Sequence, residues 1–176
     1  MNPEIRSMII LDTNVISEAI REDPSPKVQE WMTAQIEPLV TTAITVQELY
    51  YGVSILPDGK KKNGLMDAIK EGLHSTQAIL PYDAEAARAT ATILAKFKKS
   101  GINIKSPDDA QIAGIALAHK LPVATRNVKD FEAAGVQVIN PWDFSETMYL
   151  TQSPANAERL LKSIRNREKR NRNLDG

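Results

Sequence analysis

Acidic residues occur at four places in the chain where a short apolar run and a helical pattern meet. Three are Asp12, Glu48 and Asp109, and the fourth is the segment 125–130. If the apolar runs form parallel strands, their carboxyl ends share one edge of a sheet, where these side chains would meet. Carboxylates gathered at one place repel one another unless a cation holds them. An all-oxygen set of ligands favours Mg²⁺ or Mn²⁺ over zinc.

Such an ion activates water and neutralises charge that develops on a phosphate, so phosphodiester hydrolysis is the chemistry that this set favours. Helix capping is the simpler interpretation. Asp12 can cap the helix that follows it, and Glu48 and Asp109 can each be the third helical residue of a capping box. Capping explains any one acid alone, whereas the recurrence of acids at such junctions favours a metal site.

Length and composition limit the classes of protein to which the chain can belong. Its 176 residues suit one domain. Residues 1–143 hold 15 basic and 18 acidic side chains, whereas residues 144–176 hold 7 and 4. The main part is therefore not a basic nucleic-acid module, and any nucleic acid must be bound locally or through metal ions. With no cysteine, two histidines and no long apolar run, we expect no disulfide, no zinc site, no membrane span and a cytoplasmic location.

The pattern of apolar residues predicts an α/β fold, with a mostly parallel sheet that helices cover on both faces. The predicted strands are residues 8–11, 39–44, 79–80, 122–125 and 136–139. The predicted helices begin after Asp12 and cover about 28–36, 45–52, 65–73, 84–100, 107–119 and 131–135. Ser106 followed by Pro107 is the clearest helix start, because serine caps helices and proline favours the first helical position.

Five motifs along residues 8–143 resemble those of PIN-domain toxins of the VapC/FitB type. They are Leu11-Asp12-Thr13-Asn14-Val15-Ile16-Ser17, Ala43-Ile44-Thr45-Val46-Gln47-Glu48-Leu49-Tyr50-Tyr51-Gly52, Pro107-Asp108-Asp109-Ala110-Gln111-Ile112-Ala113, Ala124-Thr125-Arg126-Asn127, and Phe131-Glu132-Ala133-Ala134-Gly135 with Val138-Ile139-Asn140-Pro141-Trp142. Their order and spacing also match, which makes the resemblance specific. It implies a PIN-like nuclease domain at residues 1–143.

The resemblance implies a metal-dependent endoribonuclease, the toxin of a bacterial type II toxin–antitoxin system, that hydrolyses RNA, often tRNA. It also implies a cognate antitoxin and a homodimer. Asp12, Glu48 and Asp109 correspond to the metal-binding acids, and Asp109 is preferred to Asp108 by its position after Pro107. The expected cofactor is Mg²⁺ or Mn²⁺.

The chain departs from the family pattern at the fourth acid. Related chains often carry aspartate directly after Thr-Arg, whereas here Asn127 stands there and Asp130 follows. Either Asn127 orients the water on the metal, or Asp130 supplies the missing charge. Both are candidate catalytic residues. Four further residues are candidate hydrogen-bonding or substrate-contacting groups: Thr13, Asn14, Thr125 and Arg126.

Residues 144–176 do not continue this pattern, and we expect a short C-terminal helical and basic tail. Residues 145–164 resemble the toxin-binding end of Phd/YefM-type antitoxins, and Ala157, Leu160, Leu161 and Ile164 form one apolar stripe at helical spacing. The tail could dock on its own or a neighbouring toxin domain, grip RNA through its basic residues, or be a partly disordered extension.

Three functions remain open from the sequence. The first is the metal-dependent ribonuclease toxin, acting through a metal-activated water. The second is a self-inhibited or inactive toxin–antitoxin fusion that acts as an interaction protein, suggested by Asn127 and the tail. The third is a metal-dependent phosphatase for small substrates, which a dependence on RNA would separate from the first.

Overall fold

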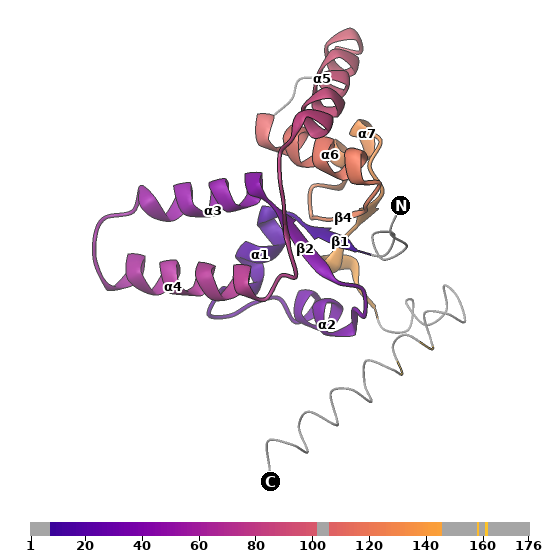
Figure 1. Cartoon of the computed structure of the whole chain (residues 1–176). Helices are drawn as coiled ribbons and strands as arrows, with labels where there is room; N and C mark the ends of the chain where they lie inside the picture. The colour runs from indigo at the N-terminus through magenta and orange to yellow at the C-terminus, as the bar shows by residue number, and fades with distance from the viewer. Residues whose placement is uncertain (1–7, 102–105, 146–157, 159–160, 162–176) are drawn as a thin grey trace.

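The structure is a computed structural model that describes residues 8–101, 106–145, 158 and 161. Strands alternate with helices along the chain (Figure 1). The strands are β1 (Ile9–Leu11), β2 (Leu39–Thr42), β3 (Ile79–Leu80), β4 (Val123–Ala124) and β5 (Val138–Ile139). The helices are α1 (Thr13–Ala19), α2 (Pro26–Ala34), α3 (Ala43–Ser54), α4 (Lys60–His74), α5 (Ala84–Lys99), α6 (Pro107–His119), α7 (Val128–Ala134) and the 3-10 helix η2 (Pro141–Asp143).

The strands form one five-stranded sheet in the order β3-β2-β1-β4-β5. Every pairing in it is parallel. This confirms the predicted α/β fold with a parallel sheet. β1 lies at the centre, between β2 and β4, so the residue that follows β1 lies in the middle of the carboxyl edge. A ligand that binds at this edge would therefore meet Asp12 first.

Two apolar cores cover the two faces of the sheet, because successive strand residues point to opposite sides. Ile10 of β1 packs with residues of α5, α6 and α7, whereas its neighbours Ile9 and Leu11 pack with residues of α1, α2, α3 and α4. In β4, Val123 packs in the same core as Ile10, and Ala124 packs in the same core as Ile9 and Leu11. The near-continuous apolar character of the strands follows from this burial on both faces.

The second strand and the helix after it differ from the sequence prediction. β2 ends at Thr42, and α3 begins at Ala43, so residues 43 and 44 are helical rather than extended. The Thr42 side chain accepts a hydrogen bond from the Thr45 amide at 3.1 Å. This bond satisfies an amide that has no partner within the helix, which stabilises the helix start at this point. Thr42 is therefore the cap, and the prediction that the helix begins at Thr45 was wrong.

Smaller differences concern element ends. β1 begins at Ile9 rather than residue 8, and α7 begins at Val128, three residues before the predicted turn of helix. α6 begins at Pro107 with Ser106 at its cap position, as predicted. Among the described helices, none is long and apolar enough to cross a membrane. Of the predicted tail helix, only Glu158 and Leu161 are among the described residues, and both are helical, whereas Ala157, Leu160 and Ile164 of its apolar stripe lie outside them.

Candidate active site

Asp12 is the first residue after the central strand, and it is 2% exposed. Its Oδ1 accepts a hydrogen bond from the Thr13 amide at 2.7 Å, which makes Asp12 the N-cap of α1. Its Oδ2 accepts bonds from Asn14 Nδ2 at 2.5 Å and from Thr125 Oγ1 at 2.6 Å. Asp12 therefore caps the helix, as predicted, and its buried carboxylate lies at the sheet edge, where the sequence predicts a metal ligand.

Thr125 and Asn14 connect the ends of two adjacent strands. Thr125 follows β4, is fully buried, and accepts bonds from Asn14 Nδ2 at 3.0 Å and from the Asn127 amide at 2.9 Å. Asn14 in turn accepts a bond from the Arg126 amide through Oδ1, at 3.2 Å. These bonds tie residues 125–127 to the start of α1 and restrict the rotation of the Asp12 carboxylate.

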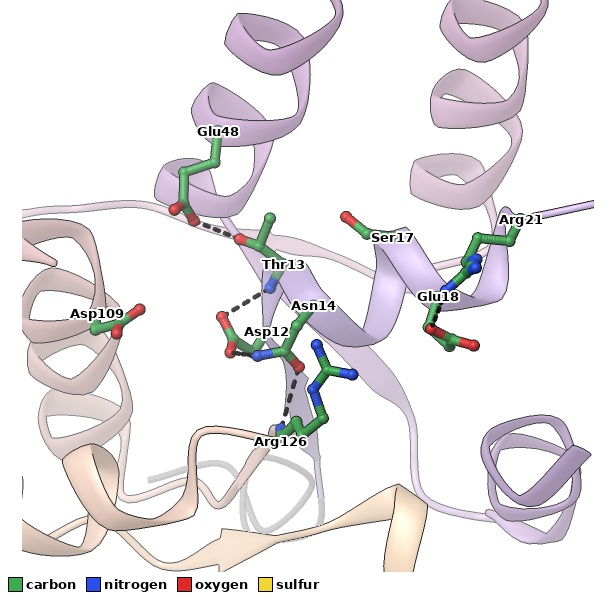
Figure 2. Close-up of a pocket in the computed structure, with 9 residues that line it drawn as sticks. All are labelled: Asp12, Thr13, Asn14, Ser17, Glu18, Arg21, Glu48, Asp109 and Arg126. Atoms are coloured by element: carbon green, nitrogen blue, oxygen red, sulfur yellow. Dashed lines mark hydrogen bonds and ion pairs between the residues drawn. The ribbon is translucent and has the colours of Figure 1, made fainter. Parts of the chain in front are cut away.

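Glu48 lies in the second turn of α3, because that helix begins earlier than predicted. The interpretation of Glu48 as a capping residue is therefore wrong. Its Oε2 accepts a short hydrogen bond from Thr13 Oγ1, as Figure 2 shows. Thr13 thus bridges two acids, since its amide bonds to Asp12 and its hydroxyl bonds to Glu48.

Asp109 is the third residue of α6, and its Oδ2 accepts a bond from Asn127 Nδ2 at 2.8 Å. Asn127 therefore reaches the acidic residues directly through its side-chain amide. Asp130 lies in the first turn of α7 and acts on Asp109 through charge repulsion, which raises the pKa of Asp109. Asp108 also repels Glu48 and Asp109, which raises the pKa of both. Asp108 itself does not line the cleft described below, whereas Asp109 does.

The pKa values of the three acids show that negative charge accumulates here. Burial raises the pKa of Asp12, against the opposing effect of its three hydrogen bonds. Burial also raises the pKa of Glu48, and repulsion by Asp12, Asp108 and Asp109 raises it further. The pKa of Asp109 rises to about 6, through burial first and then repulsion by Asp12. None of the ion pairs among the described residues involves Asp12, Glu48 or Asp109, so no basic side chain there neutralises these three acids.

A cleft of about 440 Å³ joins these groups. Figure 2 shows Asp12 near its centre, with Glu48 and Asp109 on one side and, on the other, Ser17 and Glu18 of α1 and Arg21 just beyond that helix. The cleft residues are Asp12, Thr13, Asn14, Ser17, Glu18, Arg21, Glu48, Asp109 and Arg126. Six of the predicted site residues therefore line one cleft, and Thr125 and Asn127 hydrogen-bond to acids that line it.

The chemistry of this set of side chains fits a divalent cation. Carboxylate oxygens are hard ligands, and repulsion among partly buried acids is relieved when a cation binds between them. Each carboxylate is at present turned towards hydroxyl or amide donors. Within the described ranges, no three acidic or histidine side chains are close enough to share one ion in this arrangement. An ion would therefore have to draw the three carboxylates together.

Ser17, Glu18 and Arg21 also line the cleft and were not predicted. Ser17 follows Thr13 by four residues, which places both on one face of α1, so helical spacing could have revealed Ser17. Arg21 lies two residues beyond the end of α1 and reaches the cleft as the partner of Glu18. Trp142 lies under the Arg126 side chain, with its ring centroid 5.1 Å from the guanidinium carbon. Trp142 follows a different strand from Arg126, so spacing in the sequence could not have linked the two residues.

The sequence of this chain is similar to a known protein family and to known proteins. The sequence profile of the PIN domain matches residues 9–136. The chain is 44% identical to Toxin FitB of Neisseria gonorrhoeae over 138 residues, which are 77% of this chain and 99% of that protein. It is 42% identical to VapC ribonuclease Y4jK of Sinorhizobium fredii over 139 residues, again 77% of this chain and 99% of that protein.

A solved structure shares the fold. The crystal structure of FitAcB from Neisseria gonorrhoeae superposes with a TM-score of 0.71 at 42% identity, covering 78% of this chain and 100% of that chain. The PIN-domain match, residues 9–136, includes every residue of the cleft. About a quarter of the chain lies outside the matches to these relatives.

Proposed function

This chain belongs to the PIN domain family and is a toxin of the VapC/FitB type within it, and we propose that it is a metal-dependent endoribonuclease. The reaction is the hydrolysis of an RNA phosphodiester bond. Water attacks phosphorus, the bond from phosphorus to one ribose oxygen breaks, and the departing oxygen takes up a proton. The toxin interpretation rests on the relatives, and the chemistry rests on the cleft.

One observation supports the chemistry above the others. Asp12, Glu48 and Asp109 come from three segments far apart in the chain, and they line one cleft with raised pKa values and no basic partner among the described residues. A purely structural cluster would be expected to contain neutralising lysine or arginine. We infer that a divalent cation, Mg²⁺ or Mn²⁺, supplies the missing charge.

Asp12, Glu48 and Asp109 would hold the ion. When bound, such an ion lowers the pKa of water and offsets negative charge on the phosphate. The other residues hold the acids in place: Thr13 links Asp12 to Glu48, and Asn127 holds Asp109. Fixed ligands reduce the reorganisation that the reaction requires.

The test is incubation of the protein with total bacterial RNA, with Mg²⁺, with Mn²⁺ and with neither. Purified tRNA is the first defined substrate to try. We expect discrete fragments that require the metal and that disappear in Asp12→Asn and Asp109→Asn variants. Intact RNA under every condition, with folded protein at high concentration, would contradict the proposal. Release of phosphate from small esters, without cleavage of RNA, would favour the phosphatase instead.

We further propose an antitoxin partner and a homodimer. The solved relative FitAcB and the toxin names of the relatives support such a partner. Size-exclusion chromatography with light scattering measures the oligomeric state. Co-expression with the protein encoded next to this one tests for a stable complex that no longer cuts RNA.

The alternative function, a self-inhibited fusion, has one observation in its favour. The relatives match 77% of this chain and 99% of their own length, so about a quarter of this chain lies outside the match, and we propose that this part includes residues 144–176. We propose that these residues form a second unit, and the sequence resemblance suggests that it acts as an antitoxin in cis. If so, a chain that ends after Phe144 cuts RNA faster than the full chain, and equal rates exclude inhibition by the tail.

A further inference from the structure

We propose that Arg126, held on the face of Trp142, binds a phosphate of the RNA backbone at the acidic cleft. Trp142 is then a positioning residue that acts through Arg126. This inference rests on the proposed ribonuclease function, and it adds the substrate-contacting group and the residue that holds it. The acids repel a phosphate, and their neighbouring hydroxyls and amides, although they can donate hydrogen bonds, carry no positive charge to offset that repulsion.

The sheet itself brings the two side chains together. β4 and β5 are parallel neighbours, with Ala124 opposite Ile139, and the Thr125 amide donates to the Ile139 carbonyl at 2.9 Å. Arg126 follows β4 by two residues, and Trp142 follows β5 by three. Their side chains therefore meet just beyond the same edge, with the guanidinium carbon 5.1 Å from the ring centroid.

Trp142 provides a fixed surface. It is partly buried and packs against the core that contains α1, α2, α3 and α4 residues. Asn140 accepts a hydrogen bond from the Trp142 amide at 3.2 Å and so caps the 3-10 helix η2 in which the tryptophan lies. A ring held by its backbone and by the core can restrain a flexible arginine above it.

Stacking restrains Arg126 while leaving its hydrogen-bond donors available. The attraction of a guanidinium to a ring face does not use its N–H groups, which lie in the plane of the guanidinium. Among the described residues, only the backbone amide of Arg126 is bonded, to Asn14. Arg21, at the other end of the cleft, instead pairs with Glu18 at 3.3 Å. Of the two cleft arginines, Arg126 is therefore the one free to take a phosphate.

The charge of the cleft favours such a residue. Residues 1–143 are acidic on balance, and four carboxylates line the cleft, of which only Glu18 has a basic partner among the described residues. RNA approaching this surface is repelled unless local cations offset the acids. Figure 2 shows the Arg126 side chain rising beside Asp12 and Asn14, so a phosphate bound by it would lie next to the acids.

The experiment measures RNA binding and cleavage for Arg126→Gln, Arg126→Lys, Trp142→Leu, Trp142→Phe and the double variant Arg126→Gln/Trp142→Leu. Arg88→Gln is the matched control, since Arg88 is an exposed arginine of α5 that pairs with Glu85. Unfractionated bacterial tRNA is the probe. Binding is measured in the Asp12→Asn background, where RNA stays intact, and cleavage in the otherwise unchanged protein.

We expect Arg126→Gln to weaken RNA binding about tenfold or more, because a charge-assisted bond is lost. The slope of log affinity against log salt should fall by roughly 0.7 to 0.9, as for one phosphate contact. Trp142→Leu keeps the charge, so it should weaken binding about threefold with the slope retained. Arg126→Lys and Trp142→Phe should lie between these variants and the unchanged protein.

The double variant decides the role of Trp142. If the ring acts through the arginine, Trp142→Leu adds nothing once Arg126 is glutamine, whereas additive effects would overturn the positioning role. Arg126→Gln behaving like Arg88→Gln, or weaker binding with an unchanged salt slope, would overturn the phosphate contact. Failure of the unchanged protein to cut RNA would overturn the proposed function separately, because binding is read in its own assay.

Discussion

At the scale of single residues, uncharged donors hold each of the three acids proposed to bind metal. Thr125, Asn14 and the Thr13 amide hold Asp12, the Thr13 hydroxyl holds Glu48, and Asn127 holds Asp109. These donors fix orientation without adding positive charge, so the negative potential remains available for a cation. Asn127 is the least expected of them, because related chains often carry an acid there.

We predict that Asn127→Ala weakens binding of Mn²⁺ about tenfold, the usual effect of losing a group that orients a ligand. The bond from Asn127 Nδ2 lowers the pKa of Asp109, so its loss also favours the protonated form that cannot bind metal. Isothermal titration calorimetry with Mn²⁺ measures the affinity, and Asn63→Ala, at an exposed position of α4, provides the control.

Asp130→Asn distinguishes the two interpretations of the fourth acidic position. If the amide of Asn127 is the important group, Asp130→Asn leaves Mn²⁺ affinity close to that of the unchanged protein. If instead Asp130→Asn weakens binding and Asn127→Ala does not, the charge of Asp130 fills that position and the role assigned to Asn127 is wrong.

At the scale of elements, the packing of α5 on α6 determines where Asp109 lies. Gly114 of α6 faces Thr90 and Ala86 of α5, and a Cβ atom at Gly114 would lie 2.0 Å from Thr90 Oγ1 and 2.7 Å from the Ala86 carbonyl oxygen. Thr90 is buried and also bonds to the Ala86 carbonyl at 2.9 Å. The two helices can approach this closely only because position 114 has no side chain.

We predict that Gly114→Ala lowers the free energy of unfolding by about 1–3 kcal/mol, because the helices must separate. Gly64→Ala is the matched control. Gly64 is a helical glycine of α4 with nothing within 4 Å of an added Cβ, so alanine there should stabilise by roughly 0.5–1 kcal/mol through helix propensity. Urea unfolding measures both, and equal effects of the two substitutions would contradict the close approach.

At the scale of the whole molecule, the acidic cleft links stability to pH. The pKa of Asp109 rises from 3.8 in the ordinary state to about 6 in the folded protein. Between about pH 3.8 and pH 6, Asp109 is therefore protonated in the folded protein but ionised in the unfolded chain. The stabilising contribution of Asp109 is complete below about pH 3.8 and is lost as the pH rises through about 6.

We predict that the metal-free protein loses stability relative to its Asp109→Asn variant as pH rises from about 4 to about 6, since asparagine does not ionise. Urea unfolding of both proteins in EDTA across this range measures the difference. Mg²⁺ should restore stability to the unchanged protein above about pH 6, and less so to the variant. A difference that is independent of pH would show that Asp109 titrates normally.

The sequence by itself determined the class of fold and the family. Buried strands, helix-start signals and acids at their junctions predicted the parallel α/β sheet, and the family motifs identified the PIN domain. These signals are local, because caps, apolar periodicity and motif spacing involve residues within about one or two turns of each other. The start of α3 was missed because Thr42 and Thr45 are both good caps, and the sequence did not reveal which one is used.

Only the tertiary structure decided which side chains meet. It showed that Thr13 bridges two acids, that Asn127 bonds to Asp109, and that Arg126 lies over Trp142. These contacts join residues up to 113 positions apart, as in the Thr125–Asp12 bond. They depend on strand order and register, which place β4 between β1 and β5 and which no local pattern of residues encodes.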